Sequence, residues 1–458
     1  MKLSCTLYGR TFQFGSVKEV LAKANEPKSG DVLAGLAAQS AQERMAAKLV
    51  LSELTVKDIR ENPSVPYEED EVTRIIQDDL DMAQYDRVKG MTIAELRDWI
   101  LSYDATSAKL LEVSRGLTSE VIAAVAKLMG NLDLMYAANK IEVHAHCNTT
   151  IGGRGIFSSR LQPNHPTDNV RGITSSLFEG LSYASGDAVL GLNPAIDTVN
   201  STTAVLELLY EVRQRFEIPT QICVLSHVST QMKAAQAGAP IDLCFQSIAG
   251  SQKALESFGT SAGMLSDALQ MMEELAKSEG PDYMYFETGQ ASELSSSSHH
   301  GTDQQTMESR CYGLARHYHP FLVNTVVGFM GPEYLYDGRQ VIRAALEDVF
   351  CGKLHGLPMG CDCCYTNHMQ ADQSDMDNLI TIMASTGCTY VMGLPQGDDV
   401  MLMYQSTGFH DSQAVREMLG LHPIREFEVW AEKLGILHNG RLGEKAGDLT
   451  IFGQGGAR

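Results

Sequence analysis

The sequence predicts an α/β protein built on a (β/α)8 TIM barrel, which is preceded by an N-terminal helical region. Beyond residue 145, eight short apolar runs alternate with amphipathic helical segments, whereas the apolar residues before it recur with a helical period. We expect a mainly helical accessory or assembly region over residues 1–145 and the catalytic barrel over residues 146–422. A C-terminal helix and a flexible tail are expected over residues 423–458.

The composition is that of a globular enzyme and disfavours several other classes of protein. The chain has 458 residues, of which 44% are hydrophobic and 20% charged, and its formal net charge is −21. Such an acidic chain is poorly suited to nucleic acid, because the phosphate backbone requires a basic surface. No apolar run approaches the roughly 20 residues that span a bilayer, and we see no secretory signal. Ten cysteines without a regular framework indicate reduced thiols. We therefore expect a cytoplasmic protein that binds neither nucleic acid nor membranes.

Helix signals dominate the first third of the chain. Residues 40–43 and 92–95 each have the spacing of a capping box in front of an apolar run. An apolar stripe over residues 121–128 predicts a further helix, with Gly130 as its stop. The acidic segment 68–71 suits the first turn of a helix, where the macrodipole favours negative charge. No catalytic constellation is visible here, so we expect this region to pack or assemble.

The rest of the chain alternates strands and helices. The predicted strands are residues 156–162, 187–193, 221–226, 242–247, 282–287, 320–326, 357–362 and 388–393. Amphipathic helical segments between them include residues 203–216, 263–277, 340–350 and 376–384. An open doubly wound sheet would show the same alternation, but its glycine-rich dinucleotide loop is missing.

Polar side chains stand at the C-terminal ends of the predicted strands, where barrel enzymes place their chemistry. In chain order these residues are Arg160, Gln162, Asn193, Gln246, Ser247, Glu287 and Asp362. Two carboxylates with a neutral amide suit an ammonium ion, and an arginine with an asparagine suits a hydroxyl group. No phosphate-binding loop of the GxxxxGK[ST] or GxGxxG type occurs. The pattern therefore predicts a small amino alcohol as the ligand.

The segment 359–368 allows two interpretations. In the first, Asp362 is the functional group, and Cys361 and Cys363 point away from it because strand neighbours face opposite sides. The second is a metal-dependent TIM-barrel hydrolase with a zinc site. Its ligands would be Cys361, Cys364, His368 and His227. The chain has no second CxxC, which favours the carboxylate, and we assign no metal ligand.

Two weaker alternatives remain. The His144-x-His146 pair would supply metal ligands only if residues 141–146 formed the first barrel strand. A non-enzymatic assembly scaffold would explain the helical region, but it would leave the polar strand ends without a role.

Eight motifs, spread over nearly the whole chain, share the pattern of one family. They are residues 29–35, 116–121, 160–164, 286–290, 313–318, 324–329, 360–368 and 397–399. This set resembles the large (heavy) subunit of ethanolamine ammonia-lyase, an adenosylcobalamin-dependent enzyme of ethanolamine degradation. The resemblance implies radical conversion of 2-aminoethanol to acetaldehyde and ammonia, begun by a 5′-deoxyadenosyl radical that takes a hydrogen from the carbinol carbon.

The resemblance also implies roles for individual residues. Glu287, Asp362 and Gln162 would hold the amino group. Arg160 and Asn193 would hold the hydroxyl group, and Arg160 would be catalytic together with the two carboxylates. The pocket walls would include Val326, Phe329 and Tyr404.

The same resemblance implies cofactor contacts and partners. The corrin ring would contact Pro194, Gln246, Ser295 and Met401, and the adenosyl group would lie near Ser247 and Phe258. The motif DxHxxG is absent, so we expect the cofactor bound with its dimethylbenzimidazole on cobalt. Family members hold the cobalamin between the large and a small (light) subunit, and we also expect the large subunit to form homo-oligomers. Packaging in a bacterial microcompartment stays open.

Overall fold

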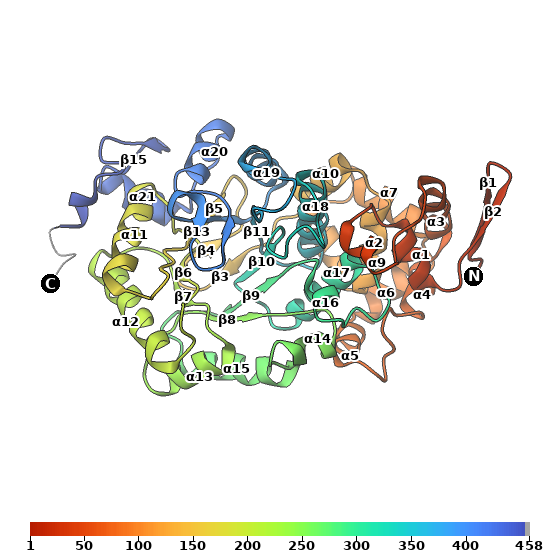
Figure 1. The fold of residues 1–458 in the computed structure, drawn as a ribbon, viewed down its shortest axis with the longest axis horizontal. Coiled ribbons are helices and arrows are strands. Elements are labelled where there is room, and N and C mark those ends of the chain that lie inside the picture. Colours follow the sequence, from red (N-terminus) through yellow and green to blue (C-terminus); the bar gives the residue numbers. More distant parts are fainter. Residues whose placement is uncertain (454–458) are drawn as a thin grey trace.

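The structure is a computed structural model that describes residues 1–453, and its centre is a barrel of eight parallel strands (Figure 1). These strands are β5 (Ser158–Leu161), β6 (Val189–Leu192), β7 (Ile222–Val224), β8 (Cys244–Ser247), β9 (Met284–Thr288), β10 (Leu322–Val326), β11 (Met359–Asp362) and β12 (Tyr390–Gly393). They pair in the order β7-β6-β5-β12-β11-β10-β9-β8, and the two end strands β7 and β8 also lie in contact. The predicted (β/α)8 barrel is therefore confirmed.

Helices connect successive strands and surround the barrel. They are α11 (Val170–Ser182), α12 (Val199–Arg215), α13 (Val228–Gln236), α14 (Gln252–Ser257), α15 (Ala262–Leu275), α16 (Ser292–Ser295), α17 (Gln304–His317), α18 (Gly338–Leu354) and α19 (Gln373–Thr386). The four amphipathic segments singled out in the sequence correspond to α12, α15, α18 and α19. Burial of their apolar faces against the strands gives the barrel its outer layer.

The N-terminal region begins with a hairpin and continues with helices. Its elements are β1 (Ser4–Leu7), β2 (Arg10–Gln13), α1 (Val17–Ala24), α2 (Ser29–Leu33), α3 (Ala41–Glu53), α4 (Val56–Arg60), α5 (Glu71–Asp78), α6 (Met82–Val88), α7 (Ile93–Leu101), α8 (Ser107–Ser114), α9 (Ser119–Lys127) and α10 (Asn131–Lys140). The capping box at Thr92 is confirmed. The assignment of Gly130 as a helix stop is wrong, because α9 already ends at Lys127 and Gly130 caps the start of α10.

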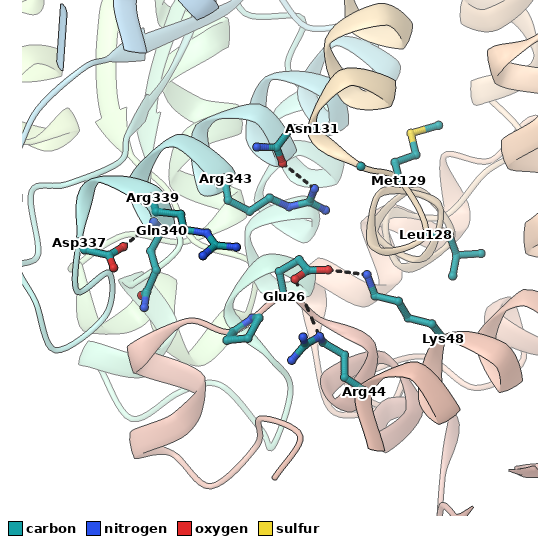
Figure 2. Close-up of a pocket in the computed structure, with 12 residues that line it drawn as sticks. Glu26, Arg44, Lys48, Leu128, Met129, Asn131, Asp337, Arg339, Gln340 and Arg343 are labelled. Carbon is teal, nitrogen blue, oxygen red and sulfur yellow. Dashed lines mark hydrogen bonds and ion pairs between the residues drawn. The ribbon is translucent and has the colours of Figure 1, made fainter. Parts of the chain in front are cut away.

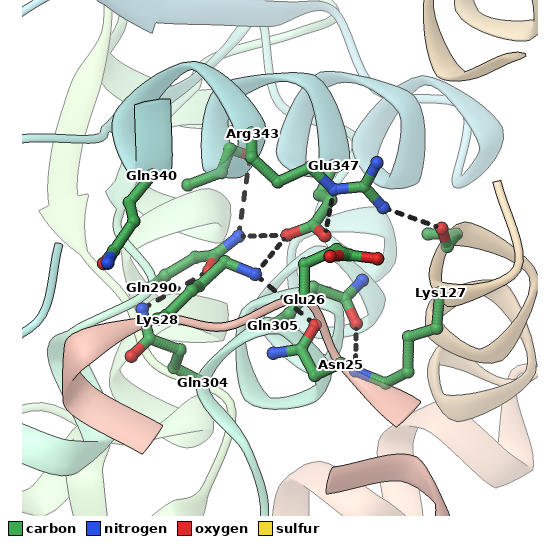
Figure 3. A network of polar contacts seen from close by, with 12 residues as sticks. Asn25, Glu26, Lys28, Lys127, Gln290, Gln304, Gln305, Gln340, Arg343 and Glu347 are labelled. Carbon is green, nitrogen blue, oxygen red and sulfur yellow. Dashed lines mark hydrogen bonds and ion pairs between the residues drawn. The ribbon is translucent and has the colours of Figure 1, made fainter. Parts of the chain in front are cut away.

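Buried ion pairs join the N-terminal helices to the barrel. The carboxylates of Asp70 and Glu120 accept hydrogen bonds from the buried guanidinium of Arg310, at 2.8 and 2.6 Å. Lys127 and Asp303 form a second pair at 2.7 Å, with both side chains fully buried. A third pair joins Lys28 to Glu347 on α18 and belongs to a wider network of amide side chains (Figure 3). Asp70 is thus more than the acidic helix start that the sequence indicates.

The remaining elements lie around the barrel. They are the hairpin of β3 (Ala145–His146) and β4 (Thr150–Ile151), the turn η1 (Pro395–Gly397), the hairpin of β13 (Asp398–Asp399) and β14 (Tyr404–Gln405), α20 (Asp411–Leu419), α21 (Arg425–Lys433), the hairpin of β15 (Leu437–His438) and β16 (Arg441–Leu442), and η2 (Leu449–Phe452). The predicted flexible tail falls largely on residues 454–458, outside the described part. Within residues 1–453, no helix combines the length and apolar character needed to cross a membrane.

We predict that Arg310→Ala strongly destabilises the protein. The substitution leaves Asp70 and Glu120 as buried carboxylates without their cation, and breaking a buried pair in this way costs about 3–5 kcal/mol. Thermal unfolding measures the effect, with Arg171→Ala on the exposed surface of α11 as the matched control. Equal unfolding midpoints for the two variants would show that the Arg310 pairs do not stabilise the fold.

Candidate active site

A cavity of about 540 Å³ opens where the barrel strands end. Its walls come from the ends of β5, β6, β8, β9 and β10 and from the loops that follow them. Among the sequence-predicted residues it is lined by Arg160, Gln162, Asn193, Pro194, Gln246, Ser247, Phe258, Glu287, Ser295, Val326, Phe329, Met401 and Tyr404. The structure thus brings together every predicted site residue except Asp362.

Arg160 lies at the centre of the polar wall. Its Nη1 donates to Glu287 Oε1 at 2.7 Å and to the Tyr285 hydroxyl at 2.6 Å. Its Nη2 donates to Asn193 Oδ1 at 3.2 Å, and its Nε donates to the Gly191 carbonyl at 3.3 Å. Burial by itself lowers the pKa of Arg160, but Tyr285 and Glu287 outweigh it and raise that pKa. The guanidinium therefore stays charged and fixes two side chains of β9 and one that directly follows β6.

Two acceptor oxygens of this wall have no partner. Glu287 Oε1 accepts from Arg160, from Tyr285 (2.8 Å) and from Asn324 (3.2 Å), whereas within residues 1–453 no donor reaches its Oε2. Gln162 is buried, and its Oε1 also lacks a donor in this part of the chain. Leaving the buried Gln162 oxygen without a partner is costly, and the free oxygen of Glu287 belongs to a residue that lines the cavity, so both are suited to a ligand that donates hydrogen bonds.

Asp362 lies behind Tyr404 rather than on the cavity wall. The Tyr404 hydroxyl donates to its Oδ2 at 2.6 Å, and the Ser406 hydroxyl donates to its Oδ1. Burial raises the pKa of Asp362 to about 7, although the hydrogen bonds from Ser406 and Tyr404 oppose this rise. Asp362 therefore titrates near neutral pH and is connected to the cavity wall by its hydrogen bond with Tyr404.

Asp399 connects the substrate side of the cavity to its rim. Its Oδ2 accepts from Gln162 Nε2 at 2.8 Å and from Asn164 Nδ2 at 2.9 Å. Its Oδ1 accepts from the backbone amides of Met401 and Leu402, both at 2.8 Å. One buried carboxylate therefore fixes the amide of Gln162 and the hairpin loop that carries Met401.

The structure does not support the zinc alternative. No group of three metal-binding side chains of the His, Cys, Asp or Glu type occurs within the described residues 1–453. Cys361 and Cys364 are fully buried, whereas His368 is exposed. Burial also raises the pKa of both thiols well above the usual value, which disfavours the thiolate that zinc requires. His146 belongs to β3, outside the barrel sheet.

Sequence reasoning missed several residues that shape the site. Tyr285 stands two positions before Glu287 on the same strand face, a spacing that could have identified it. Asp399 falls inside the motif 397–399, where its acidic character was visible but its partners were not. Asn324 falls inside the motif 324–329, where its contact with Glu287 was not visible. Ser406 gave no signal, because its importance depends on a contact with a distant segment.

A barrel of parallel strands, with a cavity at the strand ends that holds a few charged and polar groups in an apolar lining, defines an enzyme of the TIM-barrel class that acts on a small polar molecule. Comparison with known proteins assigns the family. The model of the family "Ethanolamine ammonia lyase large subunit (EutB)" matches residues 12–445. The ethanolamine ammonia-lyase large subunit of Salmonella typhimurium (strain LT2) is 56% identical over 452 residues, which cover 99% of this chain and 100% of that protein. Its counterpart in Escherichia coli (strain K12) is 55% identical with the same coverage. The chain belongs to the ethanolamine ammonia-lyase large-subunit family.

We predict that Tyr404→Phe raises the pKa of Asp362 above its present value of about 7. The variant removes a hydroxyl that donates to the carboxylate, so the charged form loses stabilisation and the proton binds more tightly. Infrared difference spectroscopy across a pH titration measures the change, and Asp362→Asn identifies the carboxyl band. Tyr365→Phe is the control, and an unchanged midpoint in Tyr404→Phe would contradict the prediction.

Proposed function

We propose that this chain is the catalytic subunit of an ethanolamine ammonia-lyase, which converts 2-aminoethanol to acetaldehyde and ammonia. Family membership supports the proposal, and one observation carries it. Glu287 Oε2 and Gln162 Oε1 are acceptors without partners in the same cavity wall as Asn193, an amide with a donor to offer. A small molecule with an ammonium group at one end and a hydroxyl group at the other satisfies all three.

The ammonium end is assigned to Glu287 and Gln162. An ammonium ion has three donors and no acceptor, and it gains most from a carboxylate in a site shielded from water. Asp362 contributes negative charge from behind Tyr404 when it is ionised. Because its pKa lies near 7, we infer that this contribution grows as the pH rises through neutrality.

The hydroxyl end is assigned to Asn193 and Arg160. Asn193 Oδ1 is occupied by Arg160, so within residues 1–453 its side-chain NH2 group has no acceptor and can donate to the substrate oxygen. Arg160 uses four of its five N–H groups in the wall and has one left, and its positive charge stabilises an oxygen that gains negative charge during the reaction.

The rim of the cavity is suited to adenosylcobalamin. Gln246, Ser247 and Phe258 lie in the wall, while Pro194 and Met401 are half-buried and Ser295 is exposed at the opening. A cavity of about 540 Å³ is too small to enclose a cobalamin, so the corrin would cover the opening and the adenosyl group would reach inside. When bound, the cofactor supplies the radical chemistry that removes a hydrogen atom from the substrate. Apolar residues such as Leu225, Phe245 and Phe329 keep water away from that reaction.

A small subunit would then cover the opposite side of the cofactor. This partner is implied by the designation "large subunit" of the family and its members. We also infer base-on binding, because the motif DxHxxG is absent. Homo-oligomerisation of the large subunit, and a cytoplasmic location with or without a bacterial microcompartment, complete the proposal.

The decisive experiment measures acetaldehyde formed from 2-aminoethanol. The large chain is mixed with adenosylcobalamin, with and without its cognate small subunit, and we expect product only in the full mixture. Absence of product from subunits that are shown to be folded and associated would refute the proposed reaction.

We predict that Glu287→Gln lowers kcat/KM for 2-aminoethanol by about a hundredfold or more, because the ammonium loses its charged acceptor and Arg160 loses its counter-ion. The acetaldehyde assay measures this loss, and Glu207→Gln on the exposed surface of α12 is the matched control. Thermal unfolding confirms that both variants are folded. Turnover near the wild-type rate in folded Glu287→Gln would exclude this residue from ammonium recognition.

A further inference from the structure

A second recess, of about 620 Å³, lies outside the barrel mouth (Figure 2). Its walls are formed by α3, by the junction of α9 and α10, by the start of α18, and by Glu26 and Pro27 after α1. None of its lining residues lines the proposed active site, so it is a separate feature of the molecule.

The recess carries an excess of positive charge. Its lining contains four cations, Arg44, Lys48, Arg339 and Arg343, but only two carboxylates. Figure 2 shows the cationic ends turned toward the space around Glu26. The lining itself therefore has two more cations than carboxylates, in a chain whose formal net charge is −21, although Arg343 is also paired with Glu347 behind the wall.

Both carboxylates of the lining already accept hydrogen bonds from groups of the protein. Glu26 accepts a hydrogen bond from Lys48 at 2.5 Å and lies 3.9 Å from Arg44. Burial raises the pKa of Glu26, but Lys48, Arg343 and Arg44 outweigh it and lower that pKa, so Glu26 stays ionised. Asp337 caps α18 by accepting from the Gln340 amide at 2.8 Å.

The unused groups in the recess are donors. Within residues 1–453 the guanidinium of Arg339 has no hydrogen-bond acceptor. Gln340 uses its side-chain oxygen to accept from Ser29 and Tyr336, which leaves its NH2 group without an acceptor in this part of the chain. The side-chain oxygen of Asn131 likewise accepts from Arg343 at 3.0 Å, and its NH2 group has no acceptor within residues 1–453. The wall therefore offers hydrogen-bond donors and a positive field to whatever enters.

Arg343 gives the recess a rigid back wall. Its side chain is only 10% exposed, and its Nε donates to Glu347 Oε1 at 2.7 Å. Its two Nη atoms donate to Asn131 Oδ1 and to the Ala126 carbonyl, at 3.0 and 3.2 Å. Glu347 is held in turn by the buried Lys28 at 2.8 Å (Figure 3). Three of the five guanidinium N–H groups are engaged, so two remain.

We infer that this recess binds a ligand through a phosphate group. A phosphate monoester carries a charge of about −1.5 to −2 at pH 7, which is complementary in sign to the cationic excess of the lining. Its oxygens are acceptors, as the free donors require, and arginine is the side chain best suited to bind them. Pro27, Leu128 and Met129 provide apolar wall for an organic part. The start of α10 adds little, because Asp133 already caps it at Gly130.

Binding of inorganic pyrophosphate to the complex of the large and small subunits tests the inference by isothermal titration calorimetry. We expect saturable binding that weakens with added salt, and a Kd about three- to tenfold higher in Arg339→Gln and in Arg44→Gln. The matched control is Arg441→Gln, an exposed arginine on β16 at the end of the molecule opposite the N-terminal helices (Figure 1), where we expect no change.

Two further ligands sharpen the result. Acetate, a single negative charge, should bind far more weakly than pyrophosphate. ADP distinguishes the source of the phosphate: tighter binding than pyrophosphate assigns an organic phosphate, and weaker binding assigns inorganic phosphate. The inference is overturned if the complex shows no saturable pyrophosphate binding, if acetate binds equally well, or if both Arg339→Gln and Arg44→Gln keep the wild-type Kd.

Discussion

The buried guanidinium of Arg160 is the interaction on which the geometry of the active site depends. It bonds at once to the hydroxyl of Tyr285, the carboxylate of Glu287 and the amide of Asn193, and so sets the positions of two side chains of β9 and one that directly follows β6. Arg160, Tyr285 and Asn324 all donate to the same oxygen of Glu287, Oε1, so the second oxygen is left for a ligand. Arg160 and Glu287 neutralise one another as an ion pair, and the free acceptor is in place before any substrate arrives.

Asp399 connects the polar wall of the cavity to its rim. By holding Gln162 and the backbone of the loop at Met401 together, it makes the two ends of the cavity parts of one rigid unit. A radical reaction benefits from such an arrangement, because the radical must be held at a fixed distance from the substrate carbon and kept away from all other groups.

The sequence predicts the barrel and most of the site well, because both follow from local patterns. Strand and helix alternation is visible residue by residue, and polar residues such as Asn193 and Glu287 converge simply because barrel strands end on one face. Contacts between distant segments were not predictable. The position of Asp362 behind Tyr404 depends on a hairpin about 40 residues further along the chain, and the role of Asp70 depends on Arg310, 240 residues away. Gly130 misled for a local reason, since glycine can begin a helix as well as end one.

The buried ion pairs at Lys28, Lys127 and Arg310 have a consequence for the history of the molecule. Each joins a residue of the N-terminal region to α17, its cap or α18, and the paired side chains are buried. Any rearrangement that separated the two regions would leave charged groups without their partners on both fragments. The helical region and the barrel are therefore bound to be inherited together, and natural variants should alter both members of a pair or neither.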